Sequence, residues 1–464
     1  MLIGFRNIRA GAGILMVCAL TIPSHGQITS PALTSALSGV EIDVTPGEIS
    51  ESGTAEFMIG GVMHTVRLEP VSVRSRGFRV LTSAEDGYNA VEPPPSVAVR
   101  GEVLGDPGSS VAGAVRDGRA ELMVTLGDGS VHEITPVLSP LGAISHASIP
   151  DPDQIGEEAT CACGAEGSAM AANPQVSLPT APTPELSTDG APQADSGSMV
   201  RIELSLDVDN RVYRQLGNNV EDVTAFVETI VTGVDQVFMN DFNTTVEIKT
   251  LMLRTSRNDD PYTQITGSFN LLNALKNEWE TNLVDERGDL VHAFSDISFT
   301  NPNGTPVGQA FLSGLCTDER YGVNKILSQD TLTRRIQLLA HEMGHGLSVL
   351  HCNVPADNNY FPGDCHIMCT SIGSCDGPGQ PNFGQGSVPI MSSFIQANIN
   401  STCLDVLAAC IADLSGDGGP DVNDILLLLN AITTGDLQTG DFDTSGILDS
   451  FDVAAFNEAL EQCL

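Results

Sequence analysis

Three histidines at fixed spacing could bind a metal ion. His341 and His345 are four residues apart, and His351 comes ten residues after the first. On a helix, residues four apart lie on one face, so two imidazoles can bind the same ion. If the helix ends near Ser348 and the chain turns back, His351 supplies a third imidazole. Three protein ligands leave one position of a zinc site open for water, which is the catalytic rather than the structural arrangement.

Glu342 directly follows the first histidine, where a general base is needed. Its carboxylate can take a proton from the water and pass it to the leaving amine. The alternative is a surface helix with two solvated histidines, because the five-residue pattern alone also occurs by chance. His351 favours the metal site. The helix is expected to begin near Thr331 or Thr333, because either side chain could cap it.

The chain around the histidines alternates between strand and helix patterns. Strand patterns cover 202–209, 245–253, 290–299 and 308–312, and helical spacing of apolar residues covers 220–238 and 269–283. Ile336, Leu339, Ala340, Met343 and Leu347 form an apolar stripe on the site helix, which is expected to pack in the core. Strands that alternate with helices predict an α/β domain with a mostly parallel sheet over residues 199–409.

Two acidic loops near the C-terminus have the spacing of calcium ligands. Oxygen-bearing side chains fall at positions 1, 3, 5, 9 and 12 of each loop, and a glycine stands at position 6, where calcium loops turn sharply. The ligands would be Asp413, Ser415, Asp417, Asp421 and Asp424 in the first loop, and Asp441, Asp443, Ser445, Asp449 and Asp452 in the second. Apolar helical patterns follow over 425–432 and 453–460. Two loops in the same register rarely arise by chance, so residues 410–464 are expected to form a small α-helical calcium module.

The N-terminal part has no catalytic constellation. Residues 1–26 have a positive start, a short apolar run and small residues at the cleavage positions, which predict a signal peptide and secretion. Residues 31–150 contain short β-branched or apolar runs broken by Gly, Pro and Asp, which predict a β-rich domain. Residues 151–198 are rich in Pro, Ala, Ser and Thr, as in a linker. No stretch is long enough to span a membrane.

Charge and cysteine content limit the partners and the compartment. The 464 residues have a net charge of −38, so nucleic acids and anionic membrane surfaces are poor partners. One of the 11 cysteines lies in the expected signal peptide, and the remaining even number predicts disulfides. Pairing among Cys352, Cys365, Cys369 and Cys375 is open, and a structural zinc site is the less favoured alternative there. Cys410 and Cys463 flank the calcium module and could join its ends.

The histidine motif resembles the adamalysin (reprolysin, ADAM-type) branch of the metzincin zinc proteases. In that family HExxHxxGxxH is followed by a Met-turn. Met368, in Cys365-His366-Ile367-Met368, is similar to the family's Cys-Ile-Met, and Met391 is a second candidate. His366 is expected to be a loop residue. Ser348 stands where the family has Gly, which adopts left-handed backbone angles without a Cβ penalty.

The resemblance extends to the N-terminal part and implies latency. Residues 99–112 and 132–136 are similar to the family's pro-domain, so residues 31–150 would be a β-rich pro-domain. In that family a Cys followed by Gly blocks the open zinc position, and Cys163-Gly164 matches this dipeptide. Cys161 is the second choice, and a Cys161–Cys163 disulfide or two idle thiols are the alternatives. The segment 151–198 would then combine the switch and a linker in which maturation cleavage falls.

The resemblance implies several further features. Cys316 would pair with Cys403, Glu203 and Asp289 would hold a structural calcium ion, and the segment 307–310 would be the edge strand that binds substrate. An exposed carboxylate is the alternative for Asp289. The C-terminal module resembles type I dockerins, which implies a cohesin-like partner.

These observations together predict a secreted, zinc-dependent metalloendopeptidase that is made as a latent precursor and hydrolyses peptide bonds in proteins or peptides. The expected cofactors are Zn²⁺ and Ca²⁺. The alternative is a catalytically silent, calcium-stabilised extracellular binding or adhesion protein that keeps the protease fold. Ser348 is the only sequence feature that favours this alternative.

Overall fold

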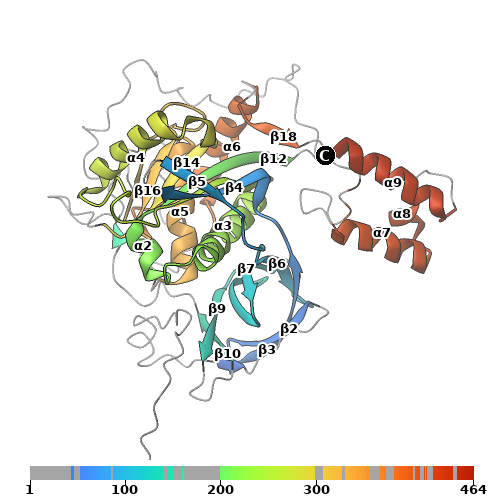
Figure 1. Ribbon diagram of the computed structural model, residues 1–464. Coiled ribbons are helices and arrows are strands. Elements are labelled where there is room, and N and C mark those ends of the chain that lie inside the picture. The colour runs from blue at the N-terminus through green and yellow to red at the C-terminus, as the bar shows by residue number, and fades with distance from the viewer. Residues whose placement is uncertain are drawn as a thin grey trace, which may run out of the picture.

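The computed structural model describes residues 43–45, 53–84, 87–138, 144–150, 159–160, 199–297, 307–326, 330–352, 354, 357, 366–372, 381–400, 403–407, 412, 414, 422–442 and 447–463. They form two large β-sheets, helices that pack on the second sheet, and a C-terminal group of helices (Figure 1). The expected signal peptide lies outside the described residues. Among the described helices, none is both long and apolar enough to cross a membrane.

The first sheet is antiparallel and curls into a barrel (Figure 1). Its end strands β1 and β2 contact each other, and its interior is filled by apolar side chains that include Phe57, Val66 and Leu122. This sheet confirms a strand-rich N-terminal region. Its strands, in spatial order, are β1 (Asp43–Thr45), β10 (Ile144–Pro150), β9 (Val131–Leu138), β8 (Arg119–Thr125), β7 (Ser110–Arg116), β6 (Ala98–Val103), β3 (Val62–Pro70) and β2 (Thr54–Ile59).

The second sheet contains the strands expected around the histidines. Five of its strands pair in parallel, while β15, β5 and β18 are antiparallel to their partners, so the expected mostly parallel α/β sheet is confirmed. Its order is β15 (Gly308–Ala310), β16 (Tyr321–Asn324), β14 (Leu290–Phe294), β12 (Met199–Val208), β13 (Thr244–Leu253), β4 (Arg74–Ala84) and β5 (Gly87–Val91), and β18 (Asp405–Leu407) pairs with β12.

Strand β14 is shorter than the expected strand 290–299. It ends at Phe294, because the Ser295 hydroxyl and the Asp296 amide both donate hydrogen bonds to the Asp209 carboxylate. Strand β15 is likewise limited to Gly308–Ala310. The expected pattern therefore identified both strands but made each of them too long.

Strands β4 and β5 come from the N-terminal part of the chain but do not join the barrel. Strand β4 pairs in parallel with β13, and β5 pairs with β4, so this hairpin forms one end of the second sheet. The opposite end is β15. The second sheet is thus built from two regions that residues 151–198 separate in sequence.

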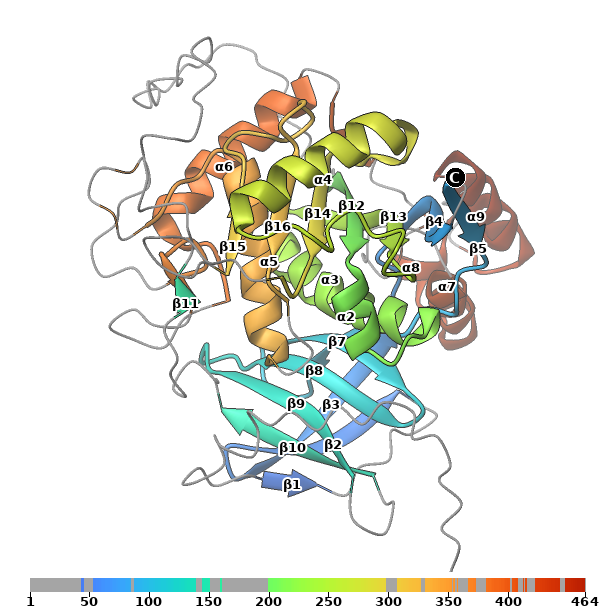
Figure 2. The ribbon, with the colours of Figure 1, turned by 60° about the vertical axis from the view of Figure 1, so that its left-hand side comes forward.

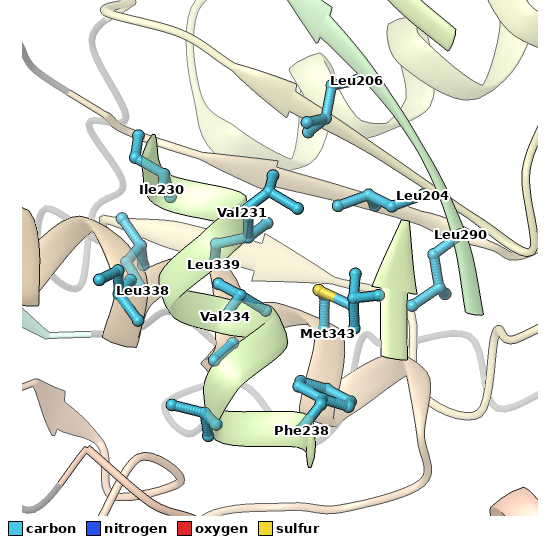
Figure 3. Close-up of a cluster of buried hydrophobic side chains, with 14 of the residues drawn as sticks. Leu204, Leu206, Ile230, Val231, Val234, Phe238, Leu290, Leu338, Leu339 and Met343 are labelled. Atoms are coloured by element: carbon cyan, nitrogen blue, oxygen red, sulfur yellow. The ribbon is translucent and has the colours of Figure 1, made fainter. Parts of the chain in front are cut away.

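The long helices α3 and α5 bury their apolar faces against the second sheet. Figure 3 shows Val231, Val234 and Phe238 of α3 gathered with Leu204 of β12 and Met343 of α5, and all five side chains are fully buried. A buried side chain of this size stabilises the fold by about 1.5–3 kcal/mol. The described helices are α2 (Asn210–Gln215), α3 (Val220–Phe242), α4 (Ser268–Asn282), the 3₁₀ turn η3 (Val284–Glu286), α5 (Leu332–Gly346), α6 (Gly384–Asn400), α7 (Val422–Thr434), α8 (Leu437–Gly440) and α9 (Ser450–Cys463).

The C-terminal helices α7 and α9 contain the expected helical segments 425–432 and 453–460. They pack on each other through a small core that includes Leu428 and Phe456, and the Phe456 ring lies against Phe442 with centroids 5.2 Å apart. This core is much smaller than that of the second sheet.

Candidate metal centre

Helix α5 holds His341 and His345 inside the protein. Thr331, one of the two expected capping residues, precedes the helix, and its side-chain oxygen accepts a hydrogen bond from the Arg334 amide at 3.3 Å. Both histidines are buried, and their ring centroids are 4.7 Å apart. The four-residue spacing therefore places both imidazoles on one face, as the sequence predicts.

The chain turns back after α5 at Ser348. Its φ angle of 75° lies in the left-handed region, where glycine is unstrained and serine is not. The Ser313 hydroxyl donates a 2.9 Å hydrogen bond to Ser348 Oγ, which helps to hold this turn. The His351 ring thereby comes to 5.3 Å from the ring of His341 and 5.0 Å from that of His345, measured between centroids. The replacement of Gly by Ser does not keep the third histidine from the group.

The three imidazoles bring their nitrogen atoms together. One nitrogen from each ring lies within 4.8 Å of the others. His341 Nδ1 lies 2.6 Å from the Ile367 carbonyl oxygen and His345 Nδ1 lies 2.7 Å from that of Val349. Since a carbonyl oxygen only accepts, each Nδ1 donates, and the neutral rings keep lone pairs on Nε2. The two Nε2 atoms face each other at 3.1 Å, an arrangement that fits a cation bound by both.

The protonation state of the histidines also suits a metal ligand. Burial lowers the pKa of His341 well below its usual range, that of His345 to about 4 and that of His351 to about 3. All three rings are therefore neutral near pH 7, as ligation requires. Neither ring nitrogen of His351 has a hydrogen-bond partner among the described residues. These residues fit a zinc ion held by three imidazoles with a fourth position open.

Glu342 lies between helix α5 and the edge strand β15. Its side chain is fully buried, and a Cβ atom added to Gly308 would lie 2.1 Å from its Oε1 atom. The carboxylate thus rests against the backbone of the strand, and only a glycine at this position leaves room for it. The sequence placed the segment 307–310 in the cleft but gave no signal for this contact, because the two residues are far apart in the chain.

Met368 lies beneath the histidine-bearing helix. It is fully buried, and its sulfur lies 2.4 Å from where a Cβ on Gly344 would be, so the glycine between the two histidines lets the methionine approach. The backbone of Ile367, next to it, accepts the hydrogen bond from His341. His366 does not join the histidine group. Met391, the second candidate for the Met-turn, lies inside helix α6 instead.

Two disulfides among the described residues connect segments near the site. Cys352 pairs with Cys369, which joins the segment after His351 to the loop of Met368, and the Cys352 amide also donates to the Met368 carbonyl at 2.9 Å. This is one of the pairings that the sequence left open. The expected pair of Cys316 with Cys403 is confirmed. Cys365, Cys375 and Cys410 lie outside the described residues.

The structure brings Asp289, which directly precedes β14, next to Glu203 of β12. Asp289 Oδ2 accepts a hydrogen bond from the Glu203 amide at 2.8 Å, and burial raises the pKa of Asp289 to about 6. The Glu203 carboxylate pairs with Lys249 at 2.9 Å. Asp289 also lies beside Cys316 and Cys403, but their sulfurs are joined in a disulfide and are not thiolate ligands. A calcium ion at this pair stays a prediction.

The structure describes only part of the two loops that the sequence predicts to bind calcium. Asp424 and Asp452, at position 12 of the two loops, are fully buried. Asp452 accepts hydrogen bonds from the amides of Phe442 at 2.8 Å and Asp449 at 2.7 Å, so its carboxylate reaches back across the second loop. The other two expected ligands that the structure describes are Asp441 and Asp449. The other expected ligands, Asp413, Ser415, Asp417, Asp421, Asp443 and Ser445, lie outside the described residues.

The segment before the expected cysteine switch lies next to the loop that contains Met368. Strand β11 (Ala159–Thr160) pairs antiparallel with β17 (Ser371–Ile372), which follows Met368 by a few residues. The chain just before Cys161 is therefore held beside the loop that supports the histidines. Cys163 itself lies outside the described residues.

Comparison with known proteins agrees with the chemistry of this site. Residues 199–402 match the model of metallo-peptidase family M12 (Reprolysin_5). The chain is 22% identical over 173 residues to two Gloydius brevicauda proteins, the zinc metalloproteinase-disintegrin-like brevilysins H2a and H2b. Each alignment covers 37% of this chain and 39% of the relative, so the chain spans about two fifths of the length of these relatives.

Two solved structures are also similar to this chain. Metalloproteinase-II from Bacteroides fragilis has a TM-score of 0.38 and 13% identity, over 72% of this chain and 88% of that chain. A zinc-dependent peptidase from Methanocorpusculum labreanum has a TM-score of 0.25 and 12% identity, over 40% of this chain and 99% of that chain. The histidine group, Glu342 and Met368 all fall within residues 199–402, and the match of this segment to metallo-peptidase family M12 supports a metallopeptidase domain.

Proposed function

We propose that this protein is a secreted zinc-dependent metalloendopeptidase, with zinc held by His341, His345 and His351. The observation that supports it best is the pair of Nε2 atoms that face each other at 3.1 Å while their Nδ1 atoms donate to backbone carbonyls. When bound, zinc would supply Lewis-acid chemistry that polarises a peptide carbonyl and lowers the pKa of water. The histidines would hold the ion, and Met368 would support their helix from below.

Glu342 would move the protons of the reaction. It would accept one from the attacking water and deliver it to the amine that leaves. Its contact with Gly308 places the carboxylate against strand β15, the edge of the sheet. An extended peptide could add to this edge by main-chain hydrogen bonds, which would present its scissile bond to the base.

The test uses purified, processed protein, zinc analysis and a casein hydrolysis assay. The wild type should hold one zinc ion and hydrolyse casein, and a chelator should abolish both. Glu342→Gln should keep the zinc and the fold but lose at least about 10²–10⁴-fold in rate. Near-wild-type hydrolysis by Glu342→Gln would show that Glu342 is not the general base. Absence of zinc and activity in the wild type would favour the silent binding protein instead.

Latency through Cys163 is a second part of the proposal. A thiolate could occupy the open zinc position, and the pairing of β11 with β17 supports it because this pairing brings the preceding residues beside the site loop. The unprocessed Cys163→Ala variant should then be more active than the unprocessed wild type. Equal latency in both, with Cys161→Ala also unchanged, would mean that no cysteine switch operates.

The C-terminal helices would form a dockerin-like calcium module with a cohesin-like partner. The buried Asp452 and its hydrogen bonds to the amides of the second loop support the module, because a position-12 carboxylate must reach the ligands at the start of the loop.

A further inference from the structure

The N-terminal hairpin is built into the second sheet. Within the N-terminal unit, defined as strands β1–β10, strand β4 pairs in parallel with β13 over Arg79–Thr82. Just before β4, the Val73 carbonyl accepts a hydrogen bond from the Ile248 amide at 2.7 Å. Val80 and Leu81 are buried in the two apolar cores of the second sheet. The hairpin thus completes this sheet rather than lying on it.

The hairpin also completes a buried charged network. Arg254 is almost fully buried, and it pairs with Asp207 at 2.6 Å and with Glu278 at 3.0 Å. Tyr88 of β5 donates a hydrogen bond to the Glu278 carboxylate, and its ring lies 5.3 Å from the Arg254 guanidinium carbon. Removal of the hairpin would open this network to water on one side.

Three ion pairs join the N-terminal unit to helix α3. All three acids lie on the helix and all three arginines belong to the N-terminal unit: Arg74 pairs with Glu228, Arg100 with Asp235, and Arg116 with Asp222. The side chains of Glu228 and Asp235 are fully buried. Loss of a cationic partner is strongly destabilising while the carboxylate stays buried, so the bound state depends on both members of each buried pair.

The barrel also contacts the start of the histidine-bearing helix α5, and Figure 2 shows the barrel strands β7 and β8 next to one end of that helix. Glu133 accepts a hydrogen bond from the Thr333 amide at 3.3 Å, and Glu121 pairs with Arg335 at 3.0 Å. The amides of a helix's first turn have no partner within the helix, so the Glu133 oxygen satisfies one of them. The N-terminal unit therefore stabilises the helix that holds His341.

We propose that the N-terminal unit stays bound as a non-covalent subunit after the chain is cut in the linker, instead of leaving as a pro-domain. Its departure would expose strand β13, leave Glu228 and Asp235 without their arginines, and remove the acids at the start of α5. The edge strand β15 lies at the other end of the sheet, so a bound N-terminal unit leaves that edge uncovered. The inference concerns the assembly of the two pieces and does not depend on peptidase activity.

The test is to cut the full-length protein at a specific protease site inserted between residues 164 and 198, with an affinity tag at the C-terminus. Both pieces should co-purify on the tag and elute as one species with the mass of the uncut protein. Amides of β13 should stay protected from hydrogen exchange after the cut. Separation of the pieces without denaturant, together with an unchanged thermal transition of the C-terminal piece, would overturn the proposal, as would rapid exchange in β13.

Matched variants identify the contacts that hold the pieces together. Arg74→Met combined with Arg100→Met should weaken the association of the cut pieces by at least about tenfold, because two buried acids lose their partners. Arg67→Met is the control. Arg67 of β3 pairs with Glu102 of β6, so both residues belong to the barrel, and their side chains are 51% and 49% exposed. If the double variant does not fold before cutting, Arg116→Met removes a partly exposed pair and should weaken association less. Equal dissociation constants for the wild type and the Arg74/Arg100 or Arg116 variants would contradict the assigned contacts.

Discussion

The contact between Gly308 and Glu342 gives a sharp test of how the sheet positions the proposed base. In Gly308→Ala the new Cβ would lie 2.1 Å from Glu342 Oε1. An ordinary contact between these atoms needs about 3.5 Å, so the carboxylate and the strand must separate by more than about 1 Å. Glu342 is fully buried, so a displaced carboxylate must be accommodated among packed neighbours.

The expected result is a loss of rate without a loss of zinc. A displacement of about 1 Å at a reacting group lowers the rate by about 10²-fold, which corresponds to about 2.7 kcal/mol of barrier. The histidine nitrogens do not touch Gly308, so zinc content should stay at the wild-type value. The assay is kcat on casein or a labelled peptide, with zinc measured on the same samples and folding checked by circular dichroism.

Gln309→Ala is the matched control for this prediction. Gln309 lies in the same strand, but its side chain accepts a hydrogen bond from Ser268 at 2.7 Å and does not approach Glu342. Because β15 would bind the peptide through its main chain, this replacement can change KM but should lower kcat far less than Gly308→Ala does. Wild-type kcat in a folded, zinc-loaded Gly308→Ala protein would refute the reasoning. Loss of zinc in that variant would also contradict it, because the strand would then support the histidines rather than the base.

Three further predictions concern stability. Ser348→Gly relieves about 1–2 kcal/mol of left-handed strain but loses a hydrogen bond worth about 0.5–1.5 kcal/mol, so denaturant unfolding should change little, whereas Ser348→Val should destabilise clearly. Burial raises the pKa of Glu133 from 4.5 to about 7, so the folded state keeps a proton that the unfolded state releases. Unfolding free energy should therefore fall as pH rises from about 4.5 to about 7, by up to about 3 kcal/mol from this group, and Glu133→Gln should flatten that slope. Asp452→Ala should remove the part of the calcium-dependent helix content that the second loop contributes in the full-length protein, and a wild-type far-UV spectrum that does not change with calcium would count against the module.

The sequence predicted the parts of the site that depend on spacing along one helix. His341 and His345 share a face because of the helical period, and Thr331 caps the helix because its side chain can accept an amide hydrogen bond. His351 was placed by assuming a turn, and the observed left-handed Ser348 supplies it. Local backbone rules were enough for these residues.

The contacts that support the site could not be predicted in the same way. The carbonyls of Ile367 and Val349 orient the imidazoles, but every residue has a carbonyl, so no residue type signals this role. The partner of Cys352 was open because four cysteines allow three pairings. Short apolar runs in residues 31–150 predicted strands, but such runs do not say which sheet a strand joins. That choice is made by backbone hydrogen bonds to a region far along the chain.

The two ends of the second sheet differ in strand length and in whether another strand covers them. This difference bears on whether the N-terminal unit can leave during maturation. An exposed strand edge attracts other extended chains, and native proteins keep such edges short or covered. Strand β15 has three residues and would be the edge that takes a peptide, whereas β13 has ten residues and is covered by the hairpin β4–β5. Loss of the hairpin would expose β13 as a long new edge, which would compete with β15 for extended peptides. Retention of the N-terminal unit would therefore keep peptide binding at β15, next to Glu342, and away from the far side of the sheet.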